Sequence, residues 1–228
     1  KQNSIDAVKY FEKAIEADPS YARAHAWRAC SLANLSDWSD EDLGPDVISK
    51  IMSAVELALE LDPNDAEANR IMGSIKLAIK KDYDMAKYHI QKARDLCPSD
   101  VYLIEKYASI LIWHGENEKA LSEIQRAMRI DPFCQDILFQ DEGICNYWLE
   151  NYDSALESLS KVKVANNNNL FYTAATYSKL DKMDKASEKL NQAKTAANFG
   201  INSFIKSQLY KDDMAKTDLK NTLQLIPN

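Results

Sequence analysis

The sequence contains few of the residues that make tight turns. Only 5 glycines and 6 prolines occur among its 228 residues. An all-β fold needs a turn between each pair of strands, so this scarcity argues against one. Alanine, leucine, lysine, glutamate and aspartate dominate instead, and this composition is typical of helices. We therefore expect an all-α protein.

Several chemical signatures are also missing. No apolar run reaches the roughly 20 residues of a membrane-spanning helix. No basic block that could follow nucleic-acid phosphates stands out, and the formal net charge is -7. Phosphate-binding glycine loops, nucleophile elbows, His-Glu-x-x-His motifs and EF-hand loops are absent. The sequence thus predicts no catalytic residue, no metal, no cofactor, and no direct binding to nucleic acid or membranes.

The four cysteines, at positions 30, 97, 134 and 145, form no Cys-x-x-Cys pair. Structural zinc sites usually take their ligands in such close pairs, so a zinc site is not expected. Unpaired cysteines are typical of a reducing compartment, where they act as small buried apolar residues. We interpret these cysteines in that way and predict a cytoplasmic protein.

The N-terminus has neither a starting methionine nor an apolar signal core. Its first residues already show the spacing of an amphipathic helix. We interpret the chain as a fragment of a larger regulatory protein.

The strongest signal is a repeat marked by proline. Prolines at 19, 63, 98 and 132 are 44, 35 and 34 residues apart, and an alanine precedes each by five residues. Proline ends a helix because the residue before it avoids the α region. A small residue at a fixed position lets that helix lie close to its neighbour. The alanines in question are Ala14, Ala58, Ala93 and Ala127.

These residues resemble the tetratricopeptide repeat (TPR) family, whose period is 34 residues. The small position of the first helix in each repeat is held by Gly73, Ala108, Gly143 and Ala174. The resemblance implies an all-α fold, a right-handed α-α superhelix (TPR solenoid). It implies about five to six helix-turn-helix repeats and a C-terminal capping helix, with a concave surface that binds a protein or peptide.

The repeats predict how the chain is organised. Residues 1–18 are expected to be the second helix of a truncated repeat, residues 19–200 the repeat array, and residues 201–228 a C-terminal cap. The array carries an acidic, irregular insert at 36–50. Its Trp38 either folds onto its own repeat or provides an extra contact for a partner.

Helix starts are predicted after three of the prolines. Ser20 and Ser99 are N-cap candidates, since serine accepts a hydrogen bond from the first turn. Asn64 followed by Glu67 is typical of a capping box. Near 162–170 the proline is missing, and the run of asparagines predicts a tight, irregular turn.

The TPR resemblance also implies which residues face the concave groove, since that surface is lined by the first helix of each repeat. A chaperone-carboxylate clamp is not expected, because only Lys106 matches the basic residues that such clamps use. Trp113, Tyr147 and Trp148 either pack between helices or anchor a peptide. Of the adjacent pair 147–148, one is expected to face the groove and the other the core. The predicted groove residues are Arg23, Arg70, Ser74, Tyr102, Glu105, Trp113, Gln140 and Tyr147.

A narrower resemblance concerns the C-terminal half. The turn "DPF" before a Tyr/Trp-rich helix and the ending "LYKDDMAKTDLKNTLQLIPN" resemble the C-terminal TPR region of bacterial class III adenylate/guanylate cyclases and of some winged-helix transcription regulators. This resemblance implies a regulatory tail that docks onto another domain of the same chain or forms a homodimer. The alternatives are a module that binds a separate protein or peptide, or an enzyme that uses a thiol or a metal.

Overall fold

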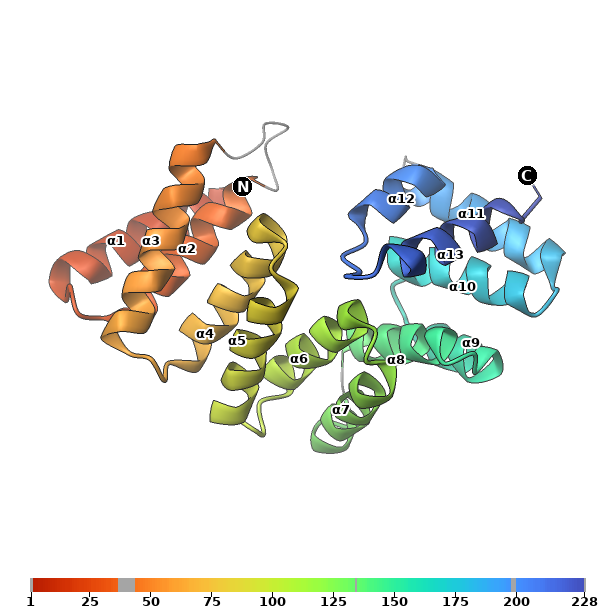
Figure 1. Cartoon of the computed structure of the whole chain (residues 1–228), viewed down its shortest axis with the longest axis horizontal. Helices are drawn as coiled ribbons and strands as arrows, with labels where there is room; N and C mark the ends of the chain where they lie inside the picture. The colour runs from red at the N-terminus through yellow and green to blue at the C-terminus, as the bar shows by residue number, and fades with distance from the viewer. Residues whose placement is uncertain (1, 37–43, 134, 198–199, 228) are drawn as a thin grey trace. The chain divides into compact units, whose positions relative to one another are not determined.

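The structure is a computed structural model that describes residues 2–36, 44–133, 135–197 and 200–227. All regular structure in these ranges is helical, which confirms the all-α prediction (Figure 1). Trp38 and Cys134, for which we stated expectations, lie outside the described residues. Residues 45–50, assigned above to the irregular insert, form the first turns of a helix that starts at Pro45. Proline suits a first helical position because its φ is already helical.

The chain divides into two compact units, Lys1–Lys106 and Tyr107–Asn228, and the division falls inside helix α6. The helices of unit 1 are α1 (Gln2–Ala17), α2 (Ala22–Ser36), α3 (Pro45–Leu61), α4 (Ala66–Ile75), the π-helical turn η1 (Lys76–Lys80), α5 (Tyr83–Leu96) and the start of α6 (Val101–His114). Those of unit 2 are the rest of α6, α7 (Asn117–Ile130), α8 (Asp136–Trp148), α9 (Tyr152–Ser160), α10 (Asn167–Lys179), α11 (Met183–Ala197), α12 (Ile201–Ser207) and α13 (Asp213–Gln224).

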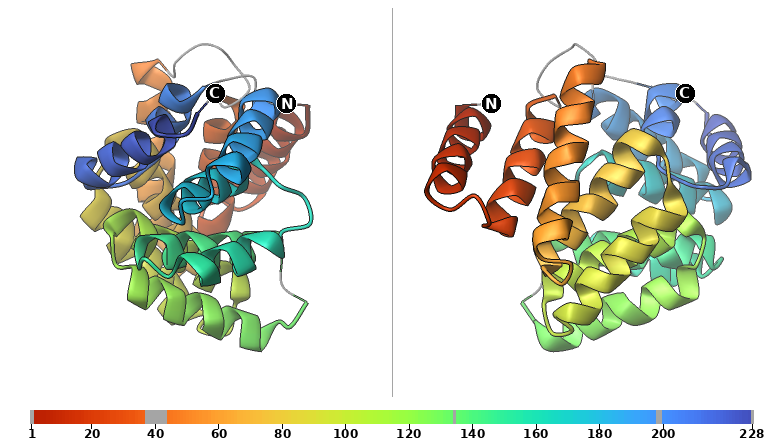
Figure 2. Two further views of the ribbon diagram at one scale, coloured as in Figure 1. Left: turned by 90° about the vertical axis from the view of Figure 1, so that its right-hand side faces the viewer. Right: turned by 60° about the vertical axis from the view of Figure 1, so that its left-hand side comes forward.

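Consecutive helices pack side by side in both units (Figures 1 and 2). In unit 1, α1 packs on α2, α2 on α3, and α4 on α5. In unit 2, α8 packs on α9 and α10 on α11; in addition, α13 packs on α10, although the two are not consecutive. Short connections between neighbouring helices produce such antiparallel pairs. This is the helix-turn-helix arrangement that the repeat predicts.

The turns inside the helix pairs repeat as well. In the four turns from η1 to α5, α6 to α7, α8 to α9 and α10 to α11, one residue has a left-handed backbone with positive φ, and these residues are 34, 35 and 31 residues apart. The short last interval agrees with the shortened period near the asparagine run. The four residues are Lys81, Gly115, Glu150 and Asp181.

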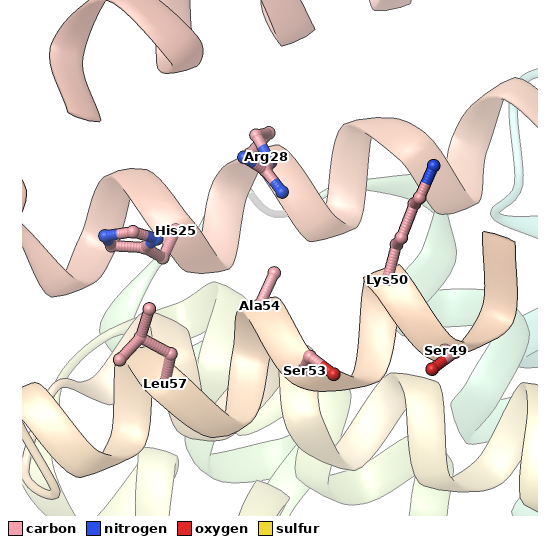
Figure 3. Close-up of a pocket in the computed structure, with 7 residues that line it drawn as sticks. All are labelled: His25, Arg28, Ser49, Lys50, Ser53, Ala54 and Leu57. Carbon is pink, nitrogen blue, oxygen red and sulfur yellow. The ribbon is translucent and has the colours of Figure 1, made fainter. Parts of the chain in front are cut away.

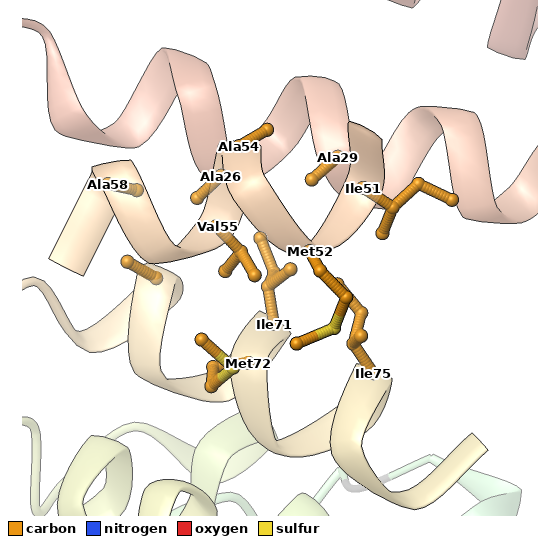
Figure 4. Close-up of a cluster of buried hydrophobic side chains, with 11 residues drawn as sticks. Ala26, Ala29, Ile51, Met52, Ala54, Val55, Ala58, Ile71, Met72 and Ile75 are labelled. Atoms are coloured by element: carbon orange, nitrogen blue, oxygen red, sulfur yellow. The ribbon is translucent and has the colours of Figure 1, made fainter. Parts of the chain in front are cut away.

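The core of unit 1 lies between α2, α3 and α4 (Figure 4). Ile51, Val55 and Ile71 are at most 1% exposed. Each such side chain contributes on the order of 2 kcal/mol when it leaves water. Small alanines from α2 and α3 fill the remaining space, so the two backbones come close together.

Two glycines hold the same packing position in different units. A Cβ on Gly73 of α4 would lie 2.6 Å from Ile90 Cγ1 and 2.9 Å from the Ala86 carbonyl oxygen of α5. A Cβ on Gly143 of α8 would lie 2.5 Å from Leu159 Cγ of α9. The small residues of the repeat therefore have the close-packing role that the sequence predicts.

The predicted helix starts after the prolines are wrong by one residue or more. α4 is capped by Asp65, whose carboxylate accepts a hydrogen bond from Ala68 N at 2.7 Å, and the cap is not Asn64. Glu67 pairs with Arg70 and does not complete a capping box. An ionised carboxylate near the positive end of the helix dipole is a stronger acceptor than an amide.

The two predicted serine caps, Ser20 and Ser99, are also wrong. At α6 the carboxylate of Asp100, one residue after Ser99, accepts hydrogen bonds from the backbone N–H groups of Tyr102 and Leu103. Ser20 donates its own N–H and O–H to Asp18, so it does not cap α2. At α4 and α6 the cap is thus the aspartate two residues after the proline, Asp65 or Asp100, whose carboxylate reaches the free N–H groups of the first turn.

The asparagine-rich turn is held by two polar side chains. Asp136 of α8 accepts hydrogen bonds from Lys163 N and Val164 N, both at 2.9 Å. Asn166 then caps α10 by accepting from Asn169 N at 3.1 Å. An irregular turn is therefore present between α9 and α10, but it ends at Asn166: residues 167–170, predicted as part of the turn, form the first turn of α10.

We expect Gly143→Ala to destabilise the protein, because the added methyl collides with the Leu159 branch point and lies 3.1 Å from the Ala155 carbonyl. The overpacking should outweigh the helix propensity gained, with a net loss on the order of 1–2 kcal/mol. Urea denaturation followed by circular dichroism measures the loss. Gly200→Ala is the control, since nothing lies within 4 Å of a Cβ there. Equal or greater stability of Gly143→Ala would contradict the close-packing role.

Candidate functional site

An arginine stacked between two aromatic rings forms the centre of the candidate site in unit 1. The guanidinium carbon of Arg70 (α4) lies 5.3 Å from the centre of the Trp27 ring (α2) and 5.4 Å from that of the Tyr102 ring (α6). Such cation–π contacts contribute about 0.5–2 kcal/mol each, more when water is excluded. We call Trp27, Arg70 and Tyr102 the Arg70 stack.

The Arg70 side chain is held rigidly. Its Nε and Nη2 both contact Glu67 Oε2 at 3.0 Å, and the residue is 5% exposed. Burial acts to lower the pKa of Arg70, but the hydrogen bond to Glu67 and the proximity of Tyr102 raise it further, so the net shift is upward. The guanidinium therefore stays charged inside the stack.

The stack becomes more exposed toward α6. Tyr102 is 48% exposed, and the ammonium of Lys106 lies 5.0 Å from the centre of its ring. Lys106 also pairs with Glu105 at 3.0 Å. Glu105 is itself buried, so the exposed parts of this region are the Tyr102 ring and the Lys106 ammonium.

A second cation lies on the same set of helices. Arg23 of α2 contacts Asp65 Oδ2 through Nε and Nη2, both at 2.8 Å. Its side chain is about half exposed, whereas that of Asp65 is buried. Asp65 thus caps α4 and positions Arg23 at the same time. Ser74 is exposed, and its hydroxyl donates to the Arg70 carbonyl at 3.1 Å.

The thiol of Cys30 interacts electrostatically with Arg70 of the stack. Burial raises the pKa of its thiol, and this effect outweighs the opposing influence of Arg70. A protonated thiol is a poor nucleophile. Burial likewise raises the pKa of Cys145 in unit 2. Both cysteines have the character of packing residues.

The predicted groove residues of unit 2 are mostly covered. Gln140 and Tyr147 are each 2% exposed. Trp113 is half buried, and its carbonyl accepts a hydrogen bond from Lys211 N at 2.8 Å. Gln140 and Tyr147 therefore offer little side-chain surface, and the backbone of Trp113 is bonded to a later part of the chain.

That later part is the segment 208–226, which we call the C-terminal segment. Its Tyr210 is 3% exposed and lies against two helices. Trp148 of α8 donates to the Tyr210 hydroxyl at 2.8 Å, and the hydroxyls of Tyr210 and Tyr172 (α10) share a hydrogen bond. Further along, Ser178 of α10 donates to the Thr222 carbonyl at 3.4 Å. The C-terminal segment therefore covers the surfaces of α8 and α10.

Of the 147–148 pair, Tyr147 is the residue that faces the core, so its assignment to the groove is wrong, whereas Trp148 is partly exposed. Tyr147 packs edge-on against the rings of Trp148, Tyr152 and Tyr172. Trp148 packs against Tyr210. Tyr147 is thus enclosed within unit 2, and Tyr210 from the end of the chain covers part of Trp148.

Sequence reasoning missed Tyr210. The segment "LYKDD" belongs to the ending that resembles the cyclase tails. An aromatic residue between apolar and charged residues does not indicate which distant residues it contacts. Burial raises the pKa of the Tyr210 hydroxyl. A lone aromatic in an otherwise polar connection is the one signal that could have indicated an anchor.

Other kinds of site are not indicated where the structure can be described. Among those residues, no three or more His, Cys, Asp or Glu side chains are placed to hold a metal ion. In the same ranges, no helix is both long and apolar enough to cross a membrane.

No protein-family model and no curated protein matches the sequence. Solved structures do. The chain is similar to PilW, a type IV pilus biogenesis factor, with 18% identity and a TM-score of 0.69 over 87% of this chain and 88% of that one. It is similar to Pseudomonas aeruginosa PilF with 18% identity and a TM-score of 0.67 over 91% of each chain.

A third similar structure is YrrB, described as a TPR protein with an unusual peptide-binding site. Its identity is 21% and its TM-score 0.58, over 92% of this chain and 97% of that one. At these identities the likeness concerns the fold alone. The chain has the fold of TPR proteins, which supports an interaction scaffold in general terms.

We expect Tyr210→Phe to weaken unit 2. The part-buried Trp148 N–H loses its acceptor and the buried Tyr172 hydroxyl loses its partner, so the expected cost is about 1–3 kcal/mol. Urea denaturation followed by tryptophan fluorescence measures it. Tyr10→Phe is the control, because Tyr10 is 69% exposed. A loss no greater than that of the control would contradict the anchoring role of Tyr210.

Proposed function

We propose that this chain is a protein- or peptide-binding module whose binding surface lies in unit 1. The surface is made by α2, α4 and residues 101–106 of α6. We call it the first-helix face. The observation that carries the proposal is the Arg70 stack, a preorganised row of aromatic and cationic groups that ends in the half-exposed Tyr102.

The chemistry of this face suggests what the partner provides. Binding hot spots favour tyrosine, tryptophan and arginine, and a rigid aromatic loses little entropy on binding. The exposed ring of Tyr102 offers a stacking surface for an aromatic or aliphatic side chain. Arg23 and Lys106 provide cations at the exposed edge, and the carboxylates paired with them are buried. An extended segment with an apolar side chain and a carboxylate fits this arrangement.

The contrast between the units supports this choice. Gln140 and Tyr147, predicted for binding, are covered in unit 2. The predicted residues of unit 1 are Arg23, Arg70, Ser74, Tyr102 and Glu105. They lie on α2, α4 and α6, around one stack. YrrB, which has the same fold, is described as having a peptide-binding site, and a peptide is the partner class proposed here.

An alternative proposal is a regulatory or dimerisation tail of a class III nucleotide cyclase or a winged-helix regulator. It rests on the sequence pattern of the closing segment, whose Tyr210 is built into unit 2. In that case the occupant of the first-helix face is another domain of the same protein or a second copy. The free thiols of Cys30, Cys97 and Cys145, of which only Cys145 is buried, agree with the proposed cytoplasmic location.

The proposal is tested with peptides selected from a random display library on the full chain. We expect Tyr102→Ala to lower the affinity for the selected peptides at least tenfold, since the stacking surface is lost. Arg70→Glu should act similarly if circular dichroism shows that it folds. Tyr88→Ala is the control, because Tyr88 is 56% exposed on α5, outside the face. Fluorescence anisotropy with labelled peptides measures the affinities.

Two results would contradict the proposal. Either no peptide is selected above background, or the selected peptides bind Tyr102→Ala as well as they bind the control. Analytical ultracentrifugation separates the alternative. A dimer that Tyr102→Ala dissociates would assign the face to a second copy of this chain.

A further inference from the structure

A pocket in unit 1 lies between α2 and α3, lined by residues that are not part of the Arg70 stack (Figure 3). Its volume is about 310 Å³. α2 contributes His25 and Arg28, and α3 contributes the rest of the wall. The residues from α3 are Ser49, Lys50, Ser53, Ala54 and Leu57.

The charges of this pocket have one sign. Arg28 and Lys50 are cationic, Ser49 and Ser53 bring hydroxyls, and no carboxylate lines the pocket among the residues that the structure describes. The chain as a whole has 35 acidic residues and a formal net charge of -7. A pocket lined by cations without carboxylates therefore departs from the character of the rest of the protein.

Arg28 lacks the partners that other arginines have. Arg23, Arg70 and Arg94 of unit 1 each contact a carboxylate within 3.0 Å. The Nε–H of Arg28 is buried and meets no hydrogen-bond acceptor in the described part of the chain. A buried N–H without an acceptor is unfavourable, because it has given up its hydrogen bonds to water. An acceptor supplied by a ligand would remove that cost.

The walls are suited to a compact anion. His25 is 7% exposed, and its Nε2 lies 2.9 Å from the Pro19 carbonyl, which holds the ring at one end of the pocket. Ala54 and Leu57 add apolar surface. Ser49, Lys50, Ser53 and Leu57 are exposed, so the pocket is open to an anion from solvent.

We propose that this pocket binds a phosphate group, either as inorganic phosphate or on a phosphorylated side chain of another protein. A guanidinium donates two parallel hydrogen bonds to phosphate oxygens. Lys50 adds a mobile positive charge, and the hydroxyls of Ser49 and Ser53 can donate to the remaining oxygens. A membrane surface fits less well, because the net charge of -7 opposes approach to anionic lipids.

Isothermal titration calorimetry of the full chain with inorganic phosphate, a phosphoserine peptide and the same peptide without phosphate tests the proposal. We expect saturable binding of phosphate at one site per chain and no binding of the unmodified peptide. A phosphopeptide that binds at least tenfold tighter than inorganic phosphate assigns the site to a phosphorylated protein. Equal affinity assigns it to the free anion.

Variants locate the site. Lys50→Gln and Arg28→Gln should each weaken phosphate binding about tenfold. Lys182→Gln makes the same charge change at an exposed lysine of unit 2. Its affinity for phosphate should stay within twofold of that of the unsubstituted chain. Lys50 is exposed, so its variant keeps the test valid if Arg28→Gln fails to fold. The proposal is overturned by absence of saturable binding, by equal binding to Lys50→Gln and Lys182→Gln, or by binding confined to vesicles of anionic phospholipid.

Discussion

The structure depends on the close approach of the two helices in each pair. At Gly73 and Gly143 the space beside the Cα is already occupied by a side chain and a backbone carbonyl of the next helix. Only a residue without a side chain fits there. Because single helix pairs cannot bury their apolar faces alone, this contact and the stacking of pairs together form the core.

The consequences for binding differ between the two units. In unit 2, the C-terminal segment covers α8 and α10, and Tyr210 fills the space between Trp148 and Tyr172. In unit 1, the corresponding helices carry the Arg70 stack and a half-exposed Tyr102. The same repeat thus supports self-packing at one place and a proposed partner site at another. The difference arises from which side chains lie beside the first helices.

Much of the fold could be predicted from the sequence, since a repeated proline and repeated small residues reflect local rules. The helix caps were missed because several polar residues follow each proline, and backbone geometry decides that Asp65 and Asp100 meet the free N–H groups. Packing between helices was one of two alternatives for Tyr147, and the sequence could not decide between them, because the contact of neighbouring Trp148 with Tyr210 joins residues 62 positions apart. The pairing of Arg23 with Asp65 is likewise long-range, since 42 residues of sequence separate the two.

Hydrogen–deuterium exchange of the full chain, with and without a selected peptide, tests the central claim most directly. The claim is that unit 1 offers its first-helix face while unit 2 is covered by its own C-terminal segment. We predict that the peptide slows exchange in α2, α4 and residues 101–106, and that exchange in α8, α10 and residues 208–213 does not change. Slower exchange in α8 and α10, together with faster exchange at 208–213, would contradict the account, since the peptide would then displace the C-terminal segment.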